Sequence, residues 1–126
     1  MADSSTLTDP AATAAAVVAK VSREEKIKLL SGADFWHTEG IPAQGVARIM
    51  VTDGPHGLRK QAGSTDHVGL GDSVPATCFP TAVTLGSTWD TDLLTEVGAA
   101  LGRECQAENV GVLLGPGLNI KRHPAG

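Results

Sequence analysis

Two side chains that could bind a polar ligand lie close together in the stretch VTDGPHGLRK, residues 51–60. Asp53 offers carboxylate oxygens that accept hydrogen bonds, and Arg59 offers a fork of N–H donors, so the two together complement the vicinal hydroxyls of a sugar. Gly54 and Gly57 allow backbone conformations that are closed to other residues, and the proline between them stiffens the turn. The alternative is an ion pair that merely closes a surface turn. Spacing alone leaves the two interpretations even.

The sequence does not contain the common motifs of nucleotide-binding, serine-nucleophile or metal-binding sites. The glycine-rich run GVLLGPG, residues 111–117, fits neither the P-loop nor the dinucleotide-binding pattern, because no Lys-Ser/Thr follows it and Pro116 lacks an N–H for phosphate. No serine stands in a G-x-S-x-G elbow. The histidines lack metal-ligand spacing, so we expect neither a metal nor a cofactor. They are His37, His56, His67 and His123.

The amino-acid composition of the chain limits the classes of partner that it is expected to bind. The chain has 126 residues, of which 41% are hydrophobic and 19% charged, with a formal net charge of -4. This length suits one globular domain. Without a cluster of Lys and Arg, binding to nucleic acid is not expected, because phosphate binding needs concentrated positive charge. No apolar run approaches the about 18 residues of a membrane helix, so no membrane association is expected either.

The N-terminal twenty residues differ from the remainder of the chain. They are rich in alanine, and Asp3 and Asp9 precede the apolar run where a signal peptide needs positive charge. We therefore expect residues 1–20 to be a flexible leader and the protein to be cytoplasmic. Cys78 and Cys105 lie far apart in the chain, and we expect both to be buried free thiols, as is usual in a reducing compartment; the alternative is one disulfide between them.

The first half of the remaining sequence predicts one helix and one strand. Ser22 and Glu25 have the spacing of a capping box, and Gly32 is placed to end the helix that they begin. The apolar run 49–51 predicts a short strand buried on both faces and ended by the DGP turn. Residues 60–77 predict a long loop, and such loops are usually functional or disordered.

The second half predicts a strand, a helix and a further strand. Residues 82–85 form a short run typical of a strand, and residues 110–114 form another. Between them, Asp90 is placed to cap a helix with an apolar face that repeats every four residues. That face consists of Leu93, Val97, Leu101 and Cys105. Strands of continuous apolar character separated by a helix predict an α/β fold with a parallel sheet, in which ligands bind beyond the carboxyl ends of the strands.

Four blocks of the sequence, in the same order, resemble glycoside hydrolase family 3, the β-glucosidase group. Together they extend over most of residues 21–126, and four ordered blocks are much more specific than any one of them. The blocks are SREEKIKLLSGADFW, IPAQGVARIMVTDGPHGLRKQ, DSVPATCFPTAVTLGSTWDTDLL and GVLLGPGLNIKRHPAG. The second contains the family's D-G-P-x-G-x-R motif.

The resemblance implies that residues 21–126 are the first part of a (β/α)8, TIM-like barrel domain, incomplete in this chain, with the remainder and a second α/β domain absent. It implies that Asp53 and Arg59 bind sugar hydroxyls, whereas His56 fills a variable position and receives no role. The family's catalytic aspartate nucleophile and acid/base glutamate would both lie beyond Gly126. A barrel normally needs about 250 residues, and this chain has half that number.

The expected function is therefore that of a fragment of a retaining β-glucosidase, which hydrolyses terminal β-D-glucosyl or related residues and to which this chain contributes sugar-binding side chains. We expect the 126-residue chain alone to be inactive. Its expected partners are a small β-glucoside or oligosaccharide and the remainder of the enzyme. A homo-oligomer is a further option, because a sheet of only a few strands would leave its edges unpaired. The alternative is a non-catalytic sugar- or partner-binding module derived from the same fold.

Overall fold

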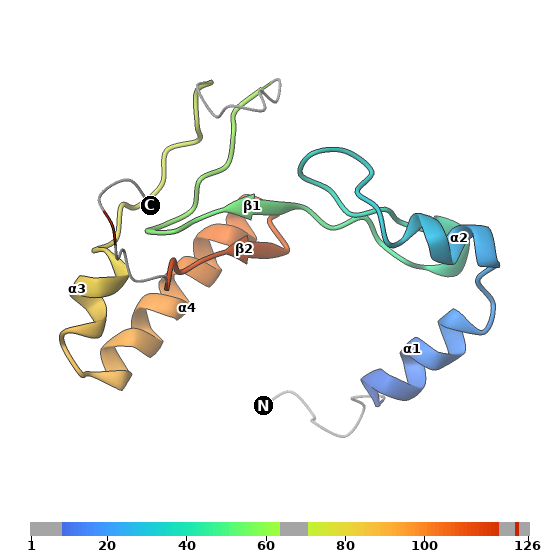
Figure 1. The fold of residues 1–126 in the computed structure, drawn as a ribbon, viewed down its shortest axis with the longest axis horizontal. Helices are drawn as coiled ribbons and strands as arrows, with labels where there is room; N and C mark the ends of the chain where they lie inside the picture. The colour runs from blue at the N-terminus through green and yellow to red at the C-terminus, as the bar shows by residue number, and fades with distance from the viewer. Residues whose placement is uncertain (1–8, 64–70, 119–122, 124–126) are drawn as a thin grey trace. The chain divides into compact units, whose positions relative to one another are not determined.

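The computed structural model describes residues 9–63, 71–118 and 123, and Figure 1 shows the order of its helices and strands. The chain divides into two units, Met1–Arg48 and Ile49–Gly126. The first contains helices α1 (Pro10–Val18) and α2 (Arg23–Lys28) and the 3-10 helix η2 (Pro42–Gln44). The second contains strands β1 (Val51–Asp53) and β2 (Val112–Leu114) and helices α3 (Ala82–Gly86) and α4 (Thr91–Ala107).

The predicted capping box is present at the start of α2. The Ser22 hydroxyl accepts a hydrogen bond from the backbone N–H of Glu25 at 3.2 Å, and the Glu25 carboxylate accepts one from the N–H of Ser22 at 2.8 Å. Both hydrogen bonds satisfy N–H groups that a helix start leaves without partners. The helix ends at Lys28, earlier than the glycine at position 32 predicted.

Part of the expected flexible leader is helical. Asp9 caps α1 by accepting a hydrogen bond from the backbone N–H of Ala11, and Pro10 stands at the first helical position, where its missing N–H costs no hydrogen bond. We did not predict this helix, although alanine is the best helix former. The division of the chain near residue 20 stays a prediction.

The parallel pairing expected of an α/β fold is present in the second unit. Strands β1 and β2 run side by side in parallel, with Val51 opposite Val112 and Asp53 opposite Leu114. The observed β1 begins two residues later than predicted. The expectation that the strands are buried on both faces is wrong for β2, because Val112 and Leu114 are 43% and 54% exposed.

Helix α3 overturns the strand predicted for residues 82–85. The Thr81 hydroxyl accepts a hydrogen bond from the backbone N–H of Thr84 at the start of the helix. Near its end, the hydroxyls of Ser87 and Thr88 donate to carbonyls of the last turn at 2.7 Å each. These flanking hydroxyls satisfy backbone groups that a helix end leaves open, which favours a short helix over a strand.

Helix α4 is capped as predicted, and its predicted apolar face is buried only near the C-terminal end. The Asp90 carboxylate accepts hydrogen bonds from two N–H groups of the first turn at 3.1 and 2.9 Å. Along the predicted face, exposure falls from Leu93 at 37% to Cys105 at 8%. Cys105 forms a buried cluster with Leu58 and Val110, against which three partly buried side chains pack. Those three are Met50, Val74 and Leu113.

Only one of the two free thiols is buried as predicted. Cys105 lies in the core, and burial raises the pKa of its thiol. Cys78 is exposed, so the expectation that both thiols are buried is wrong.

Two glycines inside α4 offer a simple test of its exposed side. A Cβ atom built at Gly98 or Gly102 meets no atom within 4 Å. Because glycine costs backbone entropy inside a helix, Gly98→Ala and Gly102→Ala should each stabilise the protein by about 0.5–1 kcal/mol. Urea unfolding followed by circular dichroism measures the change. A loss of stability would show that another surface packs against these positions.

Candidate active site loop

The loop that carries Asp53 and Arg59 is closed by hydrogen bonds to the backbone. The N–H of Arg59 donates to the carbonyl of Asp53 at 2.9 Å, and the Thr52 hydroxyl donates to the carbonyl of Arg59 at 2.6 Å. Thr52 is 1% exposed, so this second hydrogen bond is shielded from water. The backbone thus brings the two predicted residues side by side at the carboxyl end of β1. No pattern in the sequence pointed to this role of Thr52.

Both glycines of the DGPHG turn are required by their surroundings. Gly57 has a φ of 144°, which side-chain-bearing residues rarely adopt, and a Cβ there would lie 2.3 Å from the Thr77 carbonyl oxygen. A Cβ at Gly54 would lie 2.2 Å from a methyl group of Leu113. The turn therefore packs closely against the segments that contain Leu113 and Thr77. Only glycine, which has no Cβ, allows the backbone to approach them so closely.

A hollow of about 230 Å³ lies beside this turn. One wall is the turn itself, and the other is the segment that ends the long loop of residues 60–77. Arg59 lines the hollow and Asp53 does not, so the two predicted residues are joined by the backbone rather than by one shared cavity. The lining residues are Pro55, His56, Gly57, Leu58, Arg59, Val74, Ala76, Thr77 and Cys78.

The two ends of the long loop predicted for residues 60–77 pair with each other. The N–H of Val74 donates to the carbonyl of Lys60, and the N–H of Ala62 donates to the carbonyl of Asp72, each at 2.8 Å. Residues 64–70 lie outside the described part of the chain. The described ends are therefore ordered by an antiparallel pairing that the sequence did not predict.

Glu104, near the end of α4, and Glu108, the C-cap that follows the helix, bind residues in and beside the walls of the hollow. The Lys60 ammonium group donates to the Glu108 carboxylate at 3.0 Å and to the Glu108 carbonyl at 2.8 Å. The Glu104 carboxylate accepts hydrogen bonds from the hydroxyl and the backbone N–H of Thr77. Their spacing of four residues was a signal that could have revealed a shared role, because it predicts the same helix face, although the helix itself ends one residue before Glu108.

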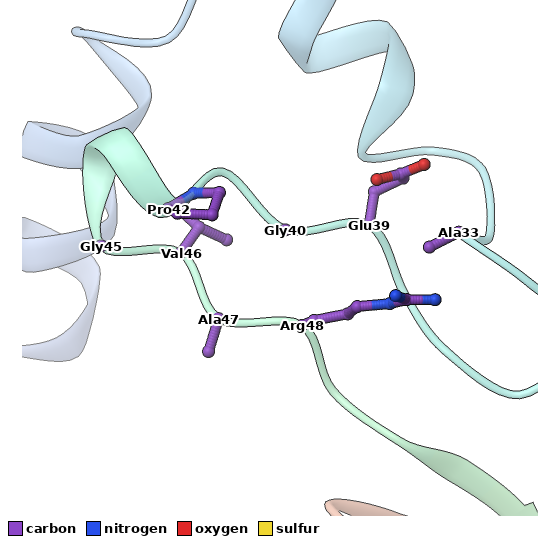
Figure 2. A pocket seen from close by; sticks show the side chains of 8 residues that line it. All are labelled: Ala33, Glu39, Gly40, Pro42, Gly45, Val46, Ala47 and Arg48. Carbon is purple, nitrogen blue, oxygen red and sulfur yellow. The ribbon is translucent and has the colours of Figure 1, made fainter.

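A second hollow, of about 380 Å³, lies within the unit Met1–Arg48, and Figure 2 shows the residues that line it. The extended side chain of Arg48 reaches toward Ala33 in this view. Arg48 forms an ion pair with Asp34, and Nδ1 of His37 lies 2.9 Å from the same carboxylate. The hydrogen bond with His37, followed by one from the backbone N–H of Trp36, lowers the pKa of Asp34 below its usual value.

The described residues hold no group of three His, Cys, Asp or Glu side chains that could bind a metal ion. Among the helices of the described ranges, none is long and apolar enough to cross a membrane.

Comparisons with known proteins test the resemblance. No protein-family profile matches the chain. It is 56% identical over 108 residues to thermostable beta-glucosidase B of Acetivibrio thermocellus, and 52% identical over 110 residues to an exo-alpha-(1->6)-L-arabinopyranosidase of Bifidobacterium longum. Each match covers 86% of this chain. The crystal structure of a Bifidobacterium adolescentis GH3 beta-glucosidase superposes with a TM-score of 0.71 at 49% identity, over 86% of this chain. The resemblance to glycoside hydrolase family 3 is confirmed.

A second solved structure that this chain resembles is that of the beta-glucosidase from Kluyveromyces marxianus in complex with glucose. It superposes with a TM-score of 0.74 at 38% identity, over 89% of this chain and 12% of its own. The chain spans 14% of the length of the Acetivibrio and Bifidobacterium proteins named above. Each match thus covers most of this chain and a small part of the protein that it matches.

Proposed function

We propose that this chain is part of a family 3 β-glucosidase and forms the N-terminal portion of its (β/α)8 barrel. Asp53 and Arg59 bind hydroxyls of the sugar whose glycosidic bond is cleaved. The observation that carries the proposal is that Asp53 ends a parallel strand in a chain 56% identical to a β-glucosidase. In barrels of this kind, active sites are built at the carboxyl ends of the strands.

The chemistry of Asp53 and Arg59 suits binding rather than bond cleavage. A carboxylate accepts hydrogen bonds from sugar hydroxyls, and the guanidinium donates to hydroxyl oxygens, so together they fix the orientation of the ring. In a retaining glycosidase, two further carboxyl groups act as nucleophile and as acid/base. We place these two catalytic carboxyl groups in the remainder of the enzyme. In this proposal, residues of this chain bind the substrate and residues elsewhere in the enzyme hydrolyse its glycosidic bond.

Exposed apolar side chains in the second unit support the proposal that the remainder of the enzyme packs here. Ile49, Val112 and Leu114 are between 43% and 54% exposed, and the described sheet has two strands. Apolar surface of this kind is costly in water, and unpaired strand edges invite further strands. Additional strands and helices of a barrel would cover both.

A segment exchange tests the proposed function. The segment of the Acetivibrio β-glucosidase that matches this chain is replaced by the corresponding residues of this chain, and release of nitrophenol from an aryl β-glucoside is measured. The chimera should hydrolyse the glucoside, and the purified 126-residue chain should not. A folded but inactive chimera would count against the proposal. Glucose binding by the isolated chain, lost in Asp53→Ala, would favour a non-catalytic sugar-binding module instead.

The relative from Bifidobacterium longum supports a second candidate, an arabinopyranosidase. Its identity of 52% is close to that of the β-glucosidase, so the two substrate classes compete. The chimera should be assayed with nitrophenyl β-D-glucopyranoside and nitrophenyl α-L-arabinopyranoside. A higher kcat/KM on the arabinoside than the Acetivibrio parent shows would mean that this segment selects that sugar.

A further inference from the structure

The acidic C-terminal end of α4 is poorly explained by helix stability. The negative end of a helix dipole favours Lys, Arg or His in the last turn, and like charges four residues apart repel. The last turn of α4 has no basic residue; Glu104 lies in this turn, and Glu108 follows four residues later as the C-cap of the helix. Two carboxylates near the C-terminal end therefore destabilise the helix slightly. This indicates that they have a role in contacts with residues outside the helix.

One of the two carboxylates contacts a residue that lines the hollow of Arg59, and the other contacts the residue that follows Arg59 in the chain. Glu108 binds the ammonium group of Lys60, next to Arg59 in the chain, and Glu104 binds Thr77 on the opposite wall. Lys60 is 23% exposed and Glu108 36% exposed, so their ion pair is partly shielded from solvent. Because Glu108 directly follows α4, one helix fixes the separation between the two carboxylates, and with it the separation between Lys60 and the wall that contains Thr77.

The anchoring of Lys60 also bears on Arg59. Arg59 and Lys60 both lie in paired, extended backbone, Arg59 opposite Asp53 and Lys60 bonded to Val74. Successive side chains of an extended chain point to opposite faces. With Lys60 held by Glu108, we infer from this alternation that the Arg59 side chain lies on the opposite face of the segment, and Arg59 lines the hollow.

We propose that Lys60, Glu104 and Glu108 are positioning residues that act through Arg59: α4 fixes the two walls so that Arg59 meets the sugar in one orientation. This inference rests on the proposed function, since it gives Arg59 a sugar to meet. A merely structural role would lower stability and leave substrate affinity unchanged. A positioning role changes KM and the inhibition constant for glucose even where the protein stays folded.

The test uses the full-length enzyme that carries this sequence. Lys60→Met and Glu108→Gln should each raise KM for the aryl glycoside and the inhibition constant for glucose by about tenfold, the effect of a displaced charged hydrogen bond. Lys60→Arg, which keeps a cation that can reach Glu108, should restore much of the affinity. Exposed residues provide matched controls, with Lys26→Met and Glu96→Gln expected to leave both constants unchanged. The thermal unfolding midpoint of each variant shows whether it is folded.

A double-mutant cycle separates failure of this inference from failure of the proposed function. If Lys60 acts through Arg59, then Lys60→Met should add little to KM in an Arg59→Ala background. Additive effects, or an unchanged KM in folded Lys60→Met, would overturn the positioning role. An unchanged KM in Arg59→Ala would overturn sugar binding by Arg59, and the positioning role with it.

Discussion

Replacing Asp53 by alanine in the full-length enzyme should lower kcat/KM for an aryl β-glucoside by about a thousandfold. A charged group that accepts hydrogen bonds contributes about 1.5–3 kcal/mol for each bond, and a carboxylate can bind two neighbouring hydroxyls. Tenfold in rate corresponds to about 1.4 kcal/mol, so two such bonds account for an effect of this size. Steady-state kinetics measure it, and glucose inhibition reports the loss of binding separately from chemistry.

Two further variants make the result specific to the Asp53 carboxylate. Asp53→Asn keeps the shape of the side chain and one acceptor oxygen, so its loss should be smaller than that of alanine. Asp72 is exposed in the described part of the loop, and Asp72→Ala should leave kcat/KM unchanged. If Asp53→Ala loses no more activity than Asp72→Ala, Asp53 does not bind the substrate.

Gly57→Ala should destabilise the protein by about 3 kcal/mol and impair sugar binding. The substitution places a methyl group 2.3 Å from the Thr77 carbonyl oxygen and imposes a φ of 144° on a residue that disfavours it. Strain of this kind costs about 1–3 kcal/mol, and the clash adds to it because a backbone atom cannot rotate away. Urea unfolding gives the change in stability, and KM reports the separation of the two walls.

Gly63 provides the matched control for backbone strain. Its φ of 89° is also positive, but a Cβ there meets nothing within 4 Å. Gly63→Ala should therefore show the strain without the clash and cost clearly less than Gly57→Ala. Equal losses in the two variants would mean that the contact between Gly57 and Thr77 contributes nothing.

Local signals in the sequence were enough to predict several elements. Ser22 with Glu25, and Asp90 at the start of α4, are helix starts whose hydrogen bonds lie within a few residues, so they depend little on the remainder of the fold. The parallel pairing of β1 and β2 followed from two apolar runs separated by a helix. The proximity of Asp53 and Arg59 followed from a short turn between them, although their role toward a sugar stays a prediction.

Features that depend on distant contacts were missed. A run as short as residues 82–85 has no period that separates a strand from a helix, and the capping hydroxyls around it decided the outcome. The hydrogen bonds of Glu104 with Thr77 and of Lys60 with Glu108 join residues 27 and 48 positions apart, beyond the range of any local pattern. The burial of Thr52 could not be predicted, because a threonine in a strand suits either face.

The pairing of β1 with β2 sets an order of events during synthesis on the ribosome. Val112, the partner of Val51, is made about sixty residues later, which takes about 3–12 seconds at 5–20 residues per second. During that interval the edge of β1 that β2 will occupy has no partner, and the Asp53 loop lacks the segment after β2 that packs against Gly54. A nascent chain in this state exposes surface that chaperones bind. Because its packing waits for β2, we expect the loop of residues 53–59 to be one of the last parts of this segment to take its final form.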